Sequence, residues 1–155
     1  MQVTFLIYFL ASITAYLGLL VGLILIKMAP EEQKPGKRYF TLLKKILFFA
    51  ILALPLYYFK INIILSSGLL LFVAGLMISH KLVLSKSYLI YFLLGIFFYL
   101  GSRIIDLFVV ESVLIFLYGI PNASLTFSQK NKNYNEVLVK NLPFFVPVAV
   151  LYLIF

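Results

Sequence analysis

Residues 3–26 read VTFLIYFLASITAYLGLLVGLILI, a stretch without a single charged side chain. About 20 apolar residues in helical conformation cross the hydrocarbon core of a bilayer, so this stretch predicts a membrane-spanning helix. It is too long for the apolar region of a secretory signal peptide. No Lys or Arg precedes it, and no convincing small-residue cleavage site follows it. We therefore expect it to be retained as the first span.

Five more apolar stretches follow the first one. Each is bounded by charged or turn-forming residues, and they cover residues 41–59, 61–79, 88–102, 104–119 and 137–155. Six such stretches leave little room for a soluble domain in a chain of 155 residues. The sequence therefore predicts an all-α fold, a polytopic transmembrane helical bundle of six spans that forms one membrane domain over residues 1–155.

Proline and glycine residues predict where these helices bend or stop. Pro55 is expected to bend the second helix, and two further prolines are expected to bend the sixth, Pro143 and Pro147. Gly119 and Pro121 are expected to end the fifth helix. Residues 122–136 are then the one clearly polar segment of the chain.

Basic residues are concentrated in alternate links between the predicted spans. Eleven of the thirteen Lys and Arg residues lie in or beside the first, third and fifth links, whereas Lys60 and Arg103 stand alone in the second and fourth. Positively charged links stay in the cytoplasm, so we expect both termini outside. A rival topology joins residues 88–102 and 104–119 into one broken span. It would place the fifth link and its lysines outside, and the charge distribution argues against it.

Composition narrows the partners and the source of the chain. Sixty-four per cent of the residues are apolar, 12% are charged, and the formal net charge is +8. The basic residues lie at the ends of apolar stretches, so we expect them to contact anionic lipid headgroups and not nucleic acid. Lys is far commoner than Arg, and Ile, Tyr, Phe and Asn are abundant. That bias indicates a prokaryote, and hence its cytoplasmic membrane.

A short pattern recurs in the first and fourth stretches at a constant offset of 83 residues. LIYFL occupies residues 6–10 and 89–93, and YLG occupies residues 16–18 and 99–101. The two copies would cross the membrane in opposite directions, as in the inverted three-plus-three repeats of transporters. Chains rich in Leu, Ile, Phe and Tyr also match themselves by chance, and the similarity fades after Gly101. A weak inverted repeat and a chance match both stay open.

Small residues form stripes on two of the predicted helices. One face of the first helix carries Ala11, Ala15, Gly18 and Gly22, and the third helix carries Gly68, Gly75 and Ser79. Small side chains let helix backbones approach closely within a bilayer. We expect both stripes to pack within the chain, and the alternative is a homodimer interface or a contact with another membrane subunit.

Glu111 lies within the fifth stretch, with apolar residues on both sides. A carboxylate at this depth is costly unless it is protonated or paired, so such residues are candidate functional groups. We expect Glu111 to turn away from lipid and to meet a Ser or Tyr of a neighbouring helix, or Arg103. Its role is either to carry a transported proton, ion or substrate, or to hold helices together.

Arg103 and Asp106 are three residues apart at the start of the fifth stretch, so they share one helical face. Asp106 also lies in the first turn, where the helix dipole favours a negative charge. We expect an interfacial cap and salt bridge, and a substrate-gating pair is the alternative.

The first link is denser in charge and turn residues than topology requires. Pro30 is expected to start a short helix, and Pro35-Gly36 predicts a turn before the second span. The charged residues that could form a docking surface are Glu31, Glu32, Lys34, Lys37 and Arg38. A soluble partner and a lipid headgroup are the two candidate ligands, and a link with interfacial anchors is the simpler interpretation.

The residues present argue against most membrane enzymes. Asp106 is the only Asp, the chain has no Cys and one His, and no Gly-x-Ser-x-Gly turn occurs. We therefore expect no enzyme and no cofactor, but a non-catalytic membrane subunit or scaffold that packs through residues 3–26 and docks through its basic first link. The alternative is a small transporter or channel that uses Glu111. Tight packing around Glu111 favours the subunit, and a cavity that reaches it favours transport.

Overall fold

The computed structural model describes residues 3–78, 87–127 and 134–154, and every regular element in these ranges is helical. In chain order the elements are α1 (Phe5–Met28), the 3₁₀ turn η1 (Pro30–Glu32), α2 (Gln33–Tyr58), α3 (Ile63–Ile78), α4 (Ser87–Gly101), α5 (Ile105–Thr126), α6 (Tyr134–Asn141), the 3₁₀ turn η2 (Leu142–Phe144) and α7 (Phe145–Ile154). Ser79, most of the predicted third link and residues 128–133 of the fifth link lie outside the described residues.

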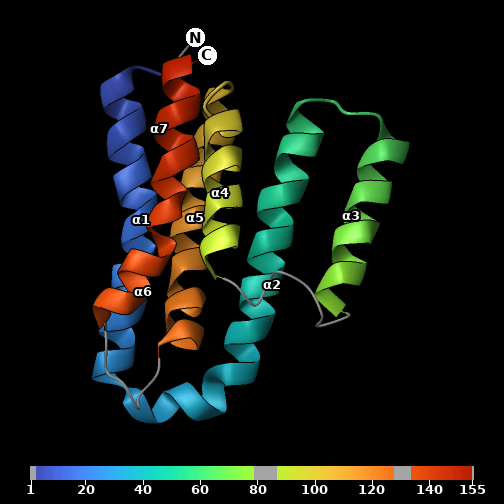
Figure 1. Ribbon diagram of the computed structural model, residues 1–155. Helices are drawn as coiled ribbons and strands as arrows, with labels where there is room; N and C mark the ends of the chain where they lie inside the picture. Colours follow the sequence, from blue (N-terminus) through green and yellow to red (C-terminus); the bar gives the residue numbers. More distant parts are fainter. Residues whose placement is uncertain (1–2, 79–86, 128–133, 155) are drawn as a thin grey trace.

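The helices run up and down in alternation, and both termini lie at the same end of the bundle (Figure 1). α6, η2 and α7 together make one bent crossing, so the described residues contain six helical segments of alternating direction. The break falls at Pro143, whose ring cannot continue a regular helix. The all-helical bundle predicted from the sequence is confirmed.

Four of these segments are long and apolar enough to cross a membrane, judged by length and composition. They are Phe5–Met28, Pro30–Tyr58, Ile105–Thr126 and Tyr134–Ile154. The other two, Ile63–Gly75 and Ser87–Gly101, are apolar but shorter. At 1.5 Å per residue, a 15-residue helix such as α4 rises about 22 Å, less than the roughly 30 Å of a bilayer core.

α1 and α5 form the closest helix pair, and glycines permit the approach. A Cβ atom on Gly18 would lie 1.9 Å from the carbonyl oxygen of Phe116, and one on Gly22 would lie 2.6 Å from that of Ile120. From the other side, a Cβ on Gly119 would lie 2.6 Å from the backbone of Gly18. Such distances are too short for any side chain, so the two backbones are in direct contact. The structure therefore places Gly18 and Gly22 of the small-residue stripe against α5.

Ala15 is also buried on this face of α1, whereas Ala11 is half-buried. Aromatic side chains fill the space between α1, α4, α5 and the α6–α7 crossing. The Phe98 ring lies within 6 Å of three others, those of Tyr8, Phe108 and Phe144. All four side chains are buried, so the core is a cluster of interlocking rings.

α2 begins earlier than predicted, and the expected turn at Pro35-Gly36 is wrong. The short helix start at Pro30 is present as η1, but α2 continues directly from it at Gln33. Pro35 falls in the first turn of α2, where a backbone N–H has no helical partner to lose. The Phe40 ring covers Gly36, since a Cβ there would lie 2.8 Å from the ring.

α5 ends later than predicted. Gly119 and Pro121 were expected to stop it, but the helix runs on to Thr126 with Pro121 inside it. Tertiary contacts outweigh local propensity here, because Gly119 packs on α1 and residues 121–124 are buried. Part of the segment predicted to be polar, residues 122–126, is therefore helical.

α4 and α5 are two antiparallel helices joined by a tight turn over residues 102–104 (Figure 1). Backbone hydrogen bonds from Ser102, Arg103 and Ile104 to the last turn of α4 reverse the chain. The rival topology, in which these two segments form one broken span, is wrong.

α3 stands at the edge of the molecule beside α2 (Figure 1). Most of its side chains are exposed, and a Cβ on Gly68 or Gly75 would meet nothing within 4 Å. The expectation that this second stripe packs within the chain is wrong for Gly68 and Gly75. Most of the described surface of α3 is therefore left uncovered by the rest of the described chain.

The two halves of the predicted repeat do not occupy equivalent places. α3 lies outside the bundle, whereas its counterpart in a three-plus-three arrangement, the α6–α7 crossing, packs against α4. The matched positions of α1 and α4 nevertheless share burial, since Tyr8 and Tyr91 are both fully buried. The shared pattern thus describes two helices with similar buried faces, without a symmetric bundle around them.

Candidate functional site

Glu111 is enclosed in the bundle. Its side chain is fully buried, and its carboxyl group lies against the end of α4, where a Cβ on Gly101 would lie 2.1 Å from Oε2. Neither carboxyl oxygen has a hydrogen-bond partner among the described residues. Glu111 therefore turns inward, but the expected Ser, Tyr or Arg103 partner is not found in that part of the chain. The absence of a side chain on Gly101 makes the room that the carboxyl group occupies.

The packing around Glu111 limits what this group can do. Glu111 does not line the open grooves that the structure shows along α2, α3 and the link between them. An ionised carboxylate that is fully buried and has no hydrogen-bond partner among the described residues costs several kcal/mol. The neutral carboxylic acid is the form that this packing accommodates.

The predicted salt bridge between Arg103 and Asp106 is not formed. Arg103 lies in the α4–α5 turn and donates a hydrogen bond to the hydroxyl of Tyr99, and its guanidinium lies 5.2 Å from the centre of that ring. Asp106 does lie in the first turn of α5, as predicted, and is exposed. The pair separates because the helix begins at Ile105, so Arg103 lies outside the regular helix on which the spacing argument depended.

Two polar residues that the sequence analysis missed lie on the same face of α5 as Glu111. Tyr118 and Asn122 follow Glu111 at intervals of seven and eleven residues, and all three side chains are fully buried. These intervals place side chains on one helical face. The pattern was readable in the sequence, but the predicted helix end at Gly119 separated Asn122 from it.

A chain of side-chain hydrogen bonds connects α4, α5 and α6 at the end of the bundle opposite the termini. Asn122 donates to Ser87 at 2.9 Å, Ser87 donates to Asn141 at 2.5 Å, and Asn141 donates to the carbonyl of Val137 at 2.6 Å. Asn122 and Asn141 are both fully buried. These bonds connect the start of α4 and the end of α6 to the last turns of α5.

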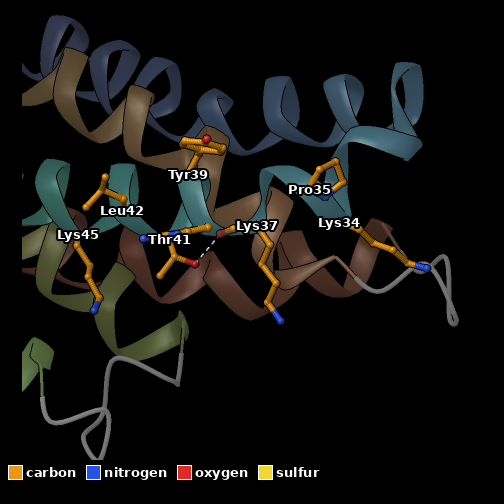
Figure 2. A pocket seen from close by; sticks show the side chains of 8 residues that line it. Lys34, Pro35, Lys37, Tyr39, Thr41, Leu42 and Lys45 are labelled. Carbon is orange, nitrogen blue, oxygen red and sulfur yellow. Dashed lines mark hydrogen bonds between the residues drawn. The ribbon is translucent and has the colours of Figure 1, made fainter.

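The first link forms a basic surface on α2. Lys34, Lys37 and Arg38 are exposed and, with Lys45, line an open groove of about 1000 Å³. Figure 2 shows Lys37, Thr41 and Lys45 along one side of the helix, with Lys34 beyond them. Thr41 donates to the carbonyl of Lys37 at 2.8 Å. Glu31 and Glu32 lie just before this surface, in η1, and are exposed.

Gln33, another residue missed in the sequence, fixes this surface to the bundle. Its amide nitrogen donates to the carbonyls of Ser124 and Phe127 at 2.8 and 2.9 Å. Lys44 also faces inward from α2, with its Nζ 5.8 Å from the centre of the Tyr118 ring. The start of α2 is thus anchored on α5, while its outer side presents positive charge.

The described residues contain no group of three His, Cys, Asp or Glu side chains that could hold a metal ion. In comparisons with known proteins, no family model, no curated protein and no solved structure matches the chain.

Proposed function

We propose that this chain is a multi-pass protein of a prokaryotic cytoplasmic membrane and works there as a non-catalytic subunit or scaffold. Four long apolar helices support insertion into a bilayer. So does the outer surface, because large apolar side chains are exposed along α1, α3 and α7, among them Ile63 and Leu153 at 80%. A surface of this kind is stable in lipid and aggregates in water.

The two ends of the bundle differ in charge, which supports an orientation. Lys60 and Arg103 lie in the links at the end that holds both termini, whereas Lys34, Lys37 and Arg38 lie at the opposite end. The positive-inside rule then places the basic surface of α2 in the cytoplasm and both termini outside.

The proposal that the chain is a subunit depends on the exposed glycines of α3. Gly18 and Gly22 of α1 are covered by α5, so these glycines are not available for contact with a partner. Gly68 and Gly75 are open, and small residues are what membrane helices use for close contact. The partner is another membrane-spanning helix, either of a second protein or of a second copy.

Crosslinking and affinity purification from native membranes test this proposal. The tagged chain should retain a membrane partner in constant ratio, and Gly68→Leu should abolish that retention while leaving the thermal midpoint of the purified chain unchanged, because nothing within the described part of the chain contacts this position. Val109→Leu, which also introduces a leucine at an exposed position but on α5, serves as the matched control. Equal retention by the Gly68→Leu chain would contradict a contact through α3.

Transport is the second candidate, and one observation favours it. Glu111 is fully buried without a partner among the described residues, and a membrane protein rarely retains such a group without use for it. Under this alternative Glu111 binds and releases a proton as the bundle opens. Purified chain in proteoliposomes should then dissipate an imposed pH gradient, and Glu111→Gln should stop it without loss of stability. A gradient that persists equally with and without the protein would exclude proton transport.

A further inference from the structure

Three buried polar atoms that lack partners in the described part of the chain gather where α4 meets α5. They are the hydroxyl oxygens of Tyr91 and Tyr118 and the side-chain carbonyl oxygen of Asn122. Their side chains are between 0 and 1% exposed. The two tyrosine rings are adjacent, with centres 5.9 Å apart, and the Asn122 side chain lies next to the Tyr91 hydroxyl.

The hydrogen-bond chain below these atoms fixes which end of the Asn122 amide is free. Its nitrogen donates one of its two N–H groups to Ser87, and the donors then point one way through Asn141 to the carbonyl of Val137. Bonds arranged in one direction polarise one another, so the free carbonyl oxygen of Asn122 is a strong acceptor that needs a donor. Lys44 does not supply it, because its amino group lies over the ring of Tyr118.

We propose that Tyr91, Tyr118 and Asn122 form a binding site for one hydroxyl oxygen, supplied by water or by a small alcohol. The hydroxyl oxygen accepts a hydrogen bond from each tyrosine and donates one to the Asn122 carbonyl. Three such bonds are the usual number for a buried water molecule. The bound hydroxyl extends the Asn122–Ser87–Asn141 chain and joins the middle of α4 to α5.

Tyrosine-to-phenylalanine substitutions test whether the hydroxyls are bonded. Tyr118→Phe should lower the thermal midpoint by about 2–4 °C, the shift expected for one lost hydrogen bond in a chain of this size. Tyr91→Phe should do the same, and the double variant should lose less than the sum because both hydroxyls share one guest. Tyr8→Phe is the matched control, since the buried Tyr8 hydroxyl donates to the carbonyl of Val148 at 3.0 Å.

The opposite outcome is equally clear. If the two hydroxyls bind nothing, their removal relieves an unsatisfied polar group, and Tyr118→Phe leaves the chain as stable or makes it more stable. That result, together with the expected loss in Tyr8→Phe, would overturn the proposal.

X-ray radiolytic labelling distinguishes the two sources of the hydroxyl. A bound water generates radicals beside Tyr91 and Tyr118, so both should be labelled several-fold more than Tyr8, although all three are equally buried. If the guest is an alcohol, labelling stays at the level of Tyr8, and ethylene glycol raises the thermal midpoint of the unaltered chain but not of Tyr118→Phe. Labelling at the level of Tyr8 with no effect of glycol would overturn the site.

Discussion

Glu111 shows at the scale of one residue how the bundle handles a carboxyl group in an apolar interior. The group is excluded from lipid and fits into the space that Gly101 leaves, but it has no hydrogen bond among the described residues. A buried polar group without a partner costs about 1–3 kcal/mol. Replacement of Glu111 by an apolar residue should therefore raise the stability of the chain. The same replacement should abolish any transport that depends on the carboxyl group.

We predict that Glu111→Leu raises the stability of the purified chain by about 1–3 kcal/mol, because it removes an unsatisfied polar group and keeps a similar volume. The thermal midpoint in detergent measures this, with Glu111→Gln as the control that keeps the polar group and the shape. A large loss of stability in Glu111→Leu would show that the carboxyl group has a partner after all.

A second prediction concerns the glycine that faces Glu111. Gly101→Ala places a methyl group 2.1 Å from Oε2, so the carboxyl group must move, at a cost of about 1–3 kcal/mol. Glu111→Ala frees the same space, so the double variant should lose less than the two single variants together. Chemical denaturation of the three proteins measures the coupling. Strict additivity would contradict the contact.

At the scale of the element, α1 and α5 depend on each other through backbone contact. Gly18→Ala forces a methyl group to within 1.9 Å of a backbone carbonyl, which cannot move aside as the end of a side chain can. We predict a loss of at least about 1–3 kcal/mol, larger than for Gly101→Ala. Thermal unfolding in detergent measures it, with Gly68→Ala as the control in open space. Equal stability of the two variants would refute the close α1–α5 contact.

α2 joins two environments, since its inner side is anchored by Gln33 and its outer side is basic. Each Lys or Arg near an anionic surface contributes about 1 kcal/mol of attraction. We predict that replacing Lys34, Lys37 and Arg38 together by Gln strongly reduces the retention of phosphatidylglycerol over phosphatidylcholine. Native mass spectrometry from mixed-lipid nanodiscs measures this ratio.

Lys60→Gln is the control for that experiment, because Lys60 lies at the other end of the bundle. Unchanged lipid retention in the triple variant would leave the basic surface without a role in headgroup binding. If the unaltered chain instead retains a soluble acidic protein and the triple variant does not, the basic surface binds a protein partner.

At the scale of the whole molecule, topology is the property to test first. Reporter fusions at Lys34 and Lys132 should report the cytoplasm, and a fusion at Lys60 should report the exterior, because of the charge split between alternate links. A fusion at Lys132 that reports the exterior would contradict the six-segment order of the helices.

The lengths of the apolar stretches in the sequence predicted much of this architecture. The apolar stretches predicted the helices to within a few residues over α1, α3 and α4. The length of an apolar stretch is a local property of the sequence. It predicts a helix because backbone groups in an apolar medium must form their hydrogen bonds within the chain. The start of α2 and the end of α5 were predicted less well. Pro35, Gly119 and Pro121 are helix breakers when judged locally, whereas the folded chain places them in a first turn or in packed contact.

The tertiary structure alone determined which helices and side chains contact one another. The stripes on α1 and α3 look alike in sequence, yet α1 contacts α5 and the glycines of α3 are open. The spacing of Glu111, Tyr118 and Asn122 places them on one face of a helix. It does not show that the Glu111 carboxyl group, the Tyr118 hydroxyl and the Asn122 carbonyl oxygen lack hydrogen-bond partners among the described residues. Which side chain contacts a given helix face depends on residues distant in the chain. For this reason the helices could be predicted from the sequence, whereas the contacts between them were determined only by the packing of the bundle.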